Sequence, residues 1–165
     1  MPAPIISFIA GSGHGKTTVI EKLIPILCRE GFRVGTIKHH VHDFTMDQPG
    51  KDTYRHKQAG AHTTALSSPT GLGIIKDVER DLSPTEIACL YFHDLDLVLT
   101  EGYKRGPIPK IEVFRKSVSS CPLKNRDHTW LAFVSNDHMD SNLPVFSPDN
   151  LTELADFLIN RFLKP

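Results

Sequence analysis

Short apolar runs alternate along this chain with amphipathic segments. The runs at 5–10 and 95–100 are almost continuously apolar, which is typical of strands covered on both faces of a sheet. Between 17 and 29, apolar residues recur every three or four positions and form one helical stripe. The whole pattern predicts strands at 5–10, 34–38, 63–67, 72–76, 95–100, 110–115 and 130–135, and helices at 17–29, 52–58, 84–92 and from 147 onward.

The first predicted strand leads into a glycine-rich turn and a helix start. Gly13 and Gly15 permit backbone conformations that turn N–H groups toward an anion, and the helix dipole favours the same ligand. We expect Lys16 to neutralise nucleotide β/γ-phosphates and the Thr17 hydroxyl to bind Mg²⁺. At His14 only the backbone is needed, so its side chain is expected to be incidental. This P-loop pattern predicts nucleotide binding by Gly11, Ser12, Gly13, His14, Gly15, Lys16, Thr17 and Thr18.

The order of elements predicts a P-loop NTPase-type α/β fold. Strands alternate with helices, which favours a mostly parallel twisted sheet with helices on both faces. With 165 residues, the chain is expected to form a single domain over 1–165.

An acidic residue follows the apolar run at 95–100. Ligands of parallel sheets bind beside the carboxyl ends of the strands, so Glu101 is expected near the metal, where it would polarise the water shell or orient an attacking water. Lys16 and Glu101 are therefore candidate catalytic residues, and Thr17 and Glu101 candidate Mg²⁺ contacts. The alternative is a solvated glutamate at a strand end.

The polar segment 38–53 contains three histidines and several aspartates. One interpretation is a transition-metal site. The other is a switch-like loop that reaches the phosphates, with Asp43, Asp47 and Asp52 near the metal or its water and Lys51 and Arg55 near the anion. We count Lys51, Asp52 and Arg55 as candidate nucleotide contacts.

The charge balance argues against nucleic acid or a membrane surface as a partner. The chain has 19 basic and 19 acidic residues and no apolar stretch of membrane-spanning length. Its three cysteines are scattered without CxxC spacing, which suits reduced thiols. We therefore expect a cytoplasmic protein.

Base selectivity has one candidate residue. Asp137 follows the strand at 130–135, where its carboxylate would accept hydrogen bonds from guanine N1 and N2. The alternative is an ordinary loop aspartate.

Five segments together resemble the family of molybdopterin-guanine dinucleotide biosynthesis protein B (MobB). They are Ser12-Gly13-His14-Gly15-Lys16-Thr17-Thr18, Ile37-Lys38-His39-His40-Val41-His42-Asp43, Asp47-Gln48-Pro49-Gly50-Lys51-Asp52-Thr53, Ala59-Gly60-Ala61 and Thr100-Glu101-Gly102-Tyr103-Lys104. The resemblance implies one P-loop GTP-binding domain, with Mg²⁺ and weak GTPase activity. It also implies a homodimer that associates with a MobA-type molybdopterin guanylyltransferase and acts on molybdopterin or its molybdenum form.

A small-molecule P-loop kinase is the alternative function. Such an enzyme needs an arginine-bearing lid, and Arg105, Arg115 and Arg126 are the candidate arginines, but the pattern predicts no helical insertion to carry them. With no evident arginine finger, hydrolysis is expected on the order of once per hour to once per minute.

Overall fold

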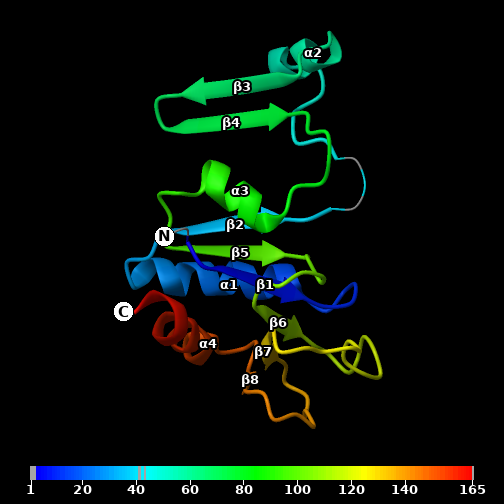
Figure 1. The fold of residues 1–165 in the computed structure, drawn as a ribbon, viewed down its shortest axis with the longest axis vertical. Coiled ribbons are helices and arrows are strands. Elements are labelled where there is room, and N and C mark those ends of the chain that lie inside the picture. Colours follow the sequence, from blue (N-terminus) through cyan, green and yellow to red (C-terminus); the bar gives the residue numbers. More distant parts are fainter. Residues whose placement is uncertain (1–2, 41, 43, 165) are drawn as a thin grey trace. The chain divides into compact units, whose positions relative to one another are not determined.

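The computed structural model describes residues 3–40, 42 and 44–164. The chain divides into two compact units (Figure 1). The first consists of Met1–His39 and Ser83–Pro165, and the second, His40–Leu82, is inserted between them in the sequence.

The first unit is built on a six-stranded sheet. Its strands are β1 (Ile5–Ile9), β2 (Val34–Lys38), β5 (Leu97–Glu101), β6 (Lys110–Val113), β7 (Trp130–Val134) and β8 (Val145–Phe146). They lie in the order β2-β5-β1-β6-β7-β8, and every neighbouring pair is parallel (Figure 1). The carboxyl ends of β1, β5, β6 and β7 therefore meet at one edge, which is where ligands of such sheets bind.

Helices cover both faces of this sheet, as the sequence predicted. Alternate residues of β1 and β5 belong to different clusters, because side chains of a strand point to opposite faces in turn. Ile6, Phe8, Leu97 and Leu99 pack with α1 (Lys16–Arg29) and α4 (Thr152–Leu158), whereas Ile5 and Val98 pack with α3 (Pro84–Tyr91). A capping box of Ser83 and Glu86 starts α3.

The C-terminal part of the first unit differs from the prediction. The last helix begins at Thr152 and continues as a π-helical turn, Ile159–Leu163, so Ser147 and Pro148 belong to a loop. The Ser147 hydroxyl donates a hydrogen bond to the Asn136 side chain at 2.9 Å. Strand β8 was missed because two residues are too few to show a pattern.

The second unit contains α2 (Asp52–Gln58) and an antiparallel hairpin of β3 (Thr63–Ser68) and β4 (Gly71–Lys76). Asp52 is the first residue of α2, and Lys51 precedes it without a capping side-chain bond. The Lys57 ammonium binds Ala61 O at 2.9 Å and Asp77 Oδ2 at 2.6 Å, which ties α2 to the end of the hairpin. The hydrogen bond from Lys57 to Asp77 and the positive charge of Lys57 lower the pKa of the Asp77 carboxyl.

Over the part of the chain that the structure describes, none of the helices has both the length and the apolar character needed to cross a membrane.

Candidate phosphate-binding site

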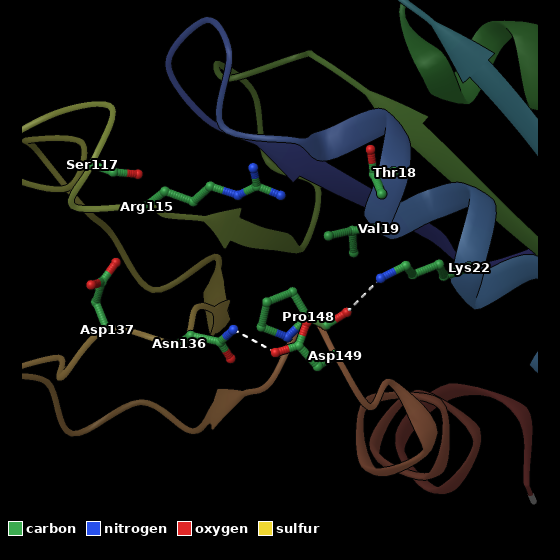
Figure 2. Close-up of a pocket in the computed structure, with 9 residues that line it drawn as sticks. All are labelled: Thr18, Val19, Lys22, Arg115, Ser117, Asn136, Asp137, Pro148 and Asp149. Carbon is green, nitrogen blue, oxygen red and sulfur yellow. Dashed lines mark hydrogen bonds between the residues drawn. The ribbon is translucent and has the colours of Figure 1, made fainter.

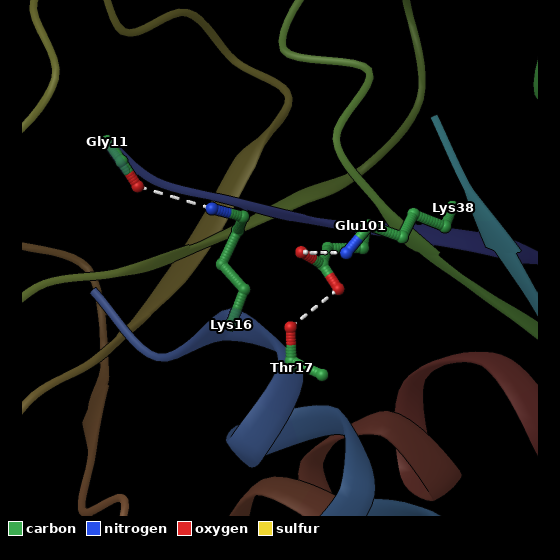
Figure 3. Close-up of polar contacts among 5 residues, drawn as sticks. All are labelled: Gly11, Lys16, Thr17, Lys38 and Glu101. Carbon is green, nitrogen blue, oxygen red and sulfur yellow. Dashed lines mark hydrogen bonds and ion pairs between the residues drawn. The ribbon is translucent and has the colours of Figure 1, made fainter. Parts of the chain in front are cut away.

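A tight loop of residues 11–15 connects β1 to α1. Gly13 and Gly15 have positive φ angles of 78° and 89°, a conformation that glycine adopts without the steric cost of a Cβ atom. The first turn of α1 carries three consecutive candidate contacts. Thr18 faces a cavity (Figure 2), whereas Lys16 and Thr17 lie beside Glu101 (Figure 3).

The Lys16 side chain bends back over the loop. Its ammonium donates to Gly11 O at 3.2 Å (Figure 3). Burial lowers the pKa of Lys16, with the Glu101 charge opposing this shift. The loop thus encloses a partly desolvated cation, which an anion bound there would stabilise.

Glu101 and Thr17 are in direct contact at the end of β5. The Thr17 hydroxyl donates to Glu101 Oε2 at 2.9 Å, and the Lys38 ammonium lies 3.3 Å from Oε1 (Figure 3). Register places Glu101 opposite Phe8, just before the loop. Hydroxyl and carboxylate oxygens suit Mg²⁺, whose octahedral ligands at about 2.1 Å are about 2.9 Å apart when adjacent. The residues present therefore fit this ion.

The His14 side chain is not incidental, contrary to the sequence-based expectation. Only 4% of the residue is exposed, and its Nδ1 accepts a hydrogen bond from the Arg115 backbone N–H at 3.0 Å. The ring also stacks on Phe114. Burial, followed by the charges of Lys16 and Arg115, lowers the pKa of His14. A neutral His14 thus fastens the loop to the end of β6.

A cavity of about 290 Å³ lies on the Thr18 side of the loop (Figure 2). Asp137 lines it, and its Oδ2 accepts from Lys116 N at 2.6 Å, which fixes the carboxylate. Asn136 Nδ2 donates to Asp149 Oδ2 at 2.7 Å and so joins the loops after β7 and β8. The cavity lining consists of Thr18, Val19, Lys22, Arg115, Ser117, Asn136, Asp137, Pro148 and Asp149.

Arg115 is the residue whose position the sequence reasoning missed. The sequence suggests Arg115 only as one of three candidate arginines of a kinase lid. In the structure it follows β6 and lies against Gly15. A Cβ atom placed on Gly15 would be 2.7 Å from Arg115 Nη2. The only sequence signal was that the strand predicted at 110–115 ends at this residue, and that signal does not show which loop lies beside it.

The structure brings together residues 11–18, Glu101 and Asp137 within the first unit. Lys51, Asp52 and Arg55 lie in the second unit, where Arg55 Nη1 is 3.9 Å from Asp52 Oδ1. Their contact with a nucleotide stays a prediction. Asp43 lies outside the described residues.

The parallel sheet, the glycine loop at the start of α1 and the Thr17–Glu101 contact define a P-loop NTPase-type α/β protein. Residues 5–136 match the family described as molybdopterin guanine dinucleotide synthesis protein B, MobB. The chain belongs to this family, which confirms the resemblance found in the sequence.

Individual relatives agree with this assignment. The molybdopterin-guanine dinucleotide biosynthesis adapter protein of Escherichia coli is 36% identical over 160 residues, covering 94% of this chain and 91% of the relative. The adapter protein of Haemophilus influenzae is 35% identical over 158 residues, covering 95% and 88%. The crystal structure of Bacillus subtilis MobB superposes with a TM-score of 0.77 at 28% identity, covering 98% and 99% of the two chains.

Proposed function

We propose that this protein is a GTP-binding adapter of molybdopterin-guanine dinucleotide biosynthesis with slow, Mg²⁺-dependent GTPase activity. It assists the guanylyltransferase that joins GMP to molybdopterin. The observation that carries the proposal is the contact of Thr17 with Glu101 beside Lys16, at the amino end of α1. The names of the relatives supply the pathway and the adapter role.

Each group of the site has a distinct task in this proposal. The backbone N–H groups of residues 11–16 hold the phosphate oxygens, and the α1 dipole adds to their attraction. Lys16 leaves Gly11 O and neutralises the β- and γ-phosphates. Thr17 and Glu101 hold Mg²⁺, which supplies charge neutralisation at the phosphates when bound. Glu101 also orients the attacking water.

Guanine selectivity belongs to Asp137 in this proposal. Its carboxylate lines the cavity on the Thr18 side and is already anchored by Lys116 N. A carboxylate accepts hydrogen bonds from the guanine N1 and N2 groups, which adenine does not offer, and this discriminates by about 1–3 kcal/mol, or about 5–150-fold.

Asp137→Asn replaces one acceptor oxygen with a donor, so we expect the GTP-over-ATP preference to fall to within about threefold. Asp140→Asn, on the exposed loop beyond, should keep the wild-type preference. A preference unchanged in Asp137→Asn would contradict this role.

The partners are a MobA-type guanylyltransferase, molybdopterin or its molybdenum form, and a second copy of the chain. The hairpin of the second unit leaves Leu66 and Leu72 each 67% exposed and Ile74 47% exposed, and apolar patches of this kind suit a protein interface.

One chain is 18.4 kDa, so light scattering of the proposed homodimer should give twice this mass. The monomer mass across the micromolar range would contradict the dimer.

Calorimetric titration with GTP and Mg²⁺ tests the nucleotide proposal. We expect saturable binding that Lys16→Ala weakens at least tenfold, because the charge-assisted phosphate contact is lost. Lys164→Ala, at an exposed position near the C-terminus, is the matched control and should bind as the wild type does. Absence of binding up to millimolar GTP would refute the proposal.

The fate of the γ-phosphate separates the adapter from the small-molecule kinase. After incubation of the protein with γ-labelled GTP and molybdopterin, we expect the label as free phosphate. Label on the pterin would identify a kinase instead.

A further inference from the structure

The Arg115 guanidinium lies directly beside the phosphate loop. A Cβ atom on Gly15 would be 2.7 Å from its Nη2 and 3.1 Å from its Cζ. Figure 2 shows the side chain running from the end of β6 toward the first turn of α1. Its backbone is fixed on both sides, because Arg115 N donates to His14 Nδ1 at 3.0 Å and Arg115 O accepts from Val118 N at 3.0 Å. The fold therefore directs this cation at the loop.

Within residues 3–40, 42 and 44–164, the guanidinium forms no ion pair and no side-chain hydrogen bond. Around His14, Lys16 and Lys104 add positive charge to that of Arg115, while Asp137 and Asp149 line the cavity that Arg115 shares. A guanidinium presents five donors in a planar fork that matches the oxygens of a phosphate. Arg115 is exposed, so its guanidinium is open to solvent and to an anion that enters the loop.

The position of Arg115 distinguishes between the phosphates. Thr17 and Glu101 mark the side of the loop where Mg²⁺ and the γ-phosphate are expected. Arg115 instead shares its cavity with Thr18 and Asp137 (Figure 2). The loop N–H groups cradle the α- and β-phosphates and Lys16 reaches the β- and γ-phosphates, so the Thr18 side is the α-phosphate side.

We propose that Arg115 binds the α-phosphate of the nucleotide and takes no part in the transfer of the γ-phosphate. This inference rests on the proposed GTP-binding function. Its consequence is that Arg115 contributes equally to GTP and GDP affinity, because both nucleotides carry the α-phosphate. It also accounts for an arginine beside the loop of a slow GTPase, since an arginine finger has to reach the γ-phosphate.

Calorimetric titration of Arg115→Gln with GTP and with GDP, each with Mg²⁺, tests the inference. We expect both dissociation constants to rise by the same factor, at least tenfold, while the rate of hydrolysis at saturating GTP stays within twofold of the wild type. Arg115→Lys keeps the charge without the planar fork and should recover part of the loss for both nucleotides. Arg29→Gln, exposed at the far end of α1, is the matched control and should change neither constant.

Two results would overturn the inference about Arg115 while leaving the proposed GTP binding intact. Unchanged affinity for both nucleotides would mean that Arg115 does not touch the ligand. Weaker GTP binding with unchanged GDP binding, or a loss in rate of tenfold or more, would assign the residue to the γ-phosphate. If the wild type binds neither nucleotide, the proposed function fails and the inference falls with it.

Discussion

The Glu101 carboxylate is held in place by Thr17 and Lys38. Its carboxylate accepts from Thr17 and lies beside Lys38, and its side chain is 17% exposed. Glu101→Gln keeps the size and one acceptor oxygen but removes the charge that we propose orients the attacking water. We expect GTP affinity to change less than threefold and phosphate release to slow at least tenfold, measured with a coupled phosphate assay. Glu153→Gln, exposed in the first turn of α4, should hydrolyse GTP at the wild-type rate. A wild-type rate in Glu101→Gln would make Glu101 structural.

His14 should make the stability of the protein depend on pH. The pKa of His14 is lowered in the folded protein, so between that pKa and about 6.5 the unfolded chain binds a proton that the folded chain does not. The contribution of His14 to the free energy of unfolding is therefore largest above about pH 6.5. It decreases as the pH falls toward the lowered pKa, with a slope of at most about 1.4 kcal/mol per pH unit.

Denaturant unfolding between pH 7.5 and 5 tests this dependence. In His14→Asn, whose amide oxygen can accept from Arg115 N without titrating, the free energy of unfolding should fall less steeply than in the wild type. His138→Asn, at an exposed position, should retain the wild-type slope. Equal slopes for wild type and His14→Asn would mean that titration of the buried ring does not contribute to the pH dependence of stability.

The residues whose proximity the sequence could predict are those whose positions follow from the local sequence. Lys16 and Thr17 occupy fixed places after the glycine turn, and Glu101 is at the end of an apolar strand. His14 and Arg115 could not be assigned in this way. Their contact joins residues 101 positions apart and exists only because β6 pairs with β1 in parallel. Roles that depend on strand order are invisible to a reading along the chain.

At the scale of elements, the phosphate loop depends on the backbone of Gly15. Alanine there would take a φ of 89° and bring its Cβ 2.7 Å from Arg115 Nη2. A left-handed residue with a Cβ costs roughly 1–2 kcal/mol, and the guanidinium must move away. We expect Gly15→Ala to bind GTP at least tenfold more weakly by calorimetry.

Gly31→Ala is the control for backbone strain. Gly31 has a φ of 91° at the other end of α1, and a Cβ there would meet nothing within 4 Å. This variant should lose a similar amount of stability in thermal unfolding while binding GTP as the wild type does. Equal GTP affinity in both variants would show that the loop does not require this geometry.

Elements bounded by clear turn residues followed most closely from the sequence. The strand at 34–38 follows Gly31, the helix at 52–58 lies between Pro49-Gly50 and Gly60, and both have the predicted bounds. Strand β8 and the start of α4 were wrong for a shared reason. Ser147-Pro148 has the composition of a helix start, but the Ser147 hydroxyl is engaged with Asn136 in the loop that lines the cavity.

For the whole first unit, the all-parallel order β2-β5-β1-β6-β7-β8 explains why distant residues share one site. Each strand end delivers one group, with the glycine loop after β1, Glu101 at the end of β5, Arg115 after β6 and Asp137 after β7. If GTP binds as proposed, the phosphates would lie over β1, the metal toward β5 and the base toward β7. In the proposed function, the order of strands would thus set the direction in which the nucleotide binds.

A crystal structure with a non-hydrolysable GTP analogue and Mg²⁺ tests this account most directly. We predict the β- and γ-phosphates within hydrogen-bond distance of Lys16, Mg²⁺ bound beside Thr17 and Glu101, and guanine in the cavity beside Asp137. A nucleotide bound elsewhere, or a reversed one with its base beside Glu101, would contradict it.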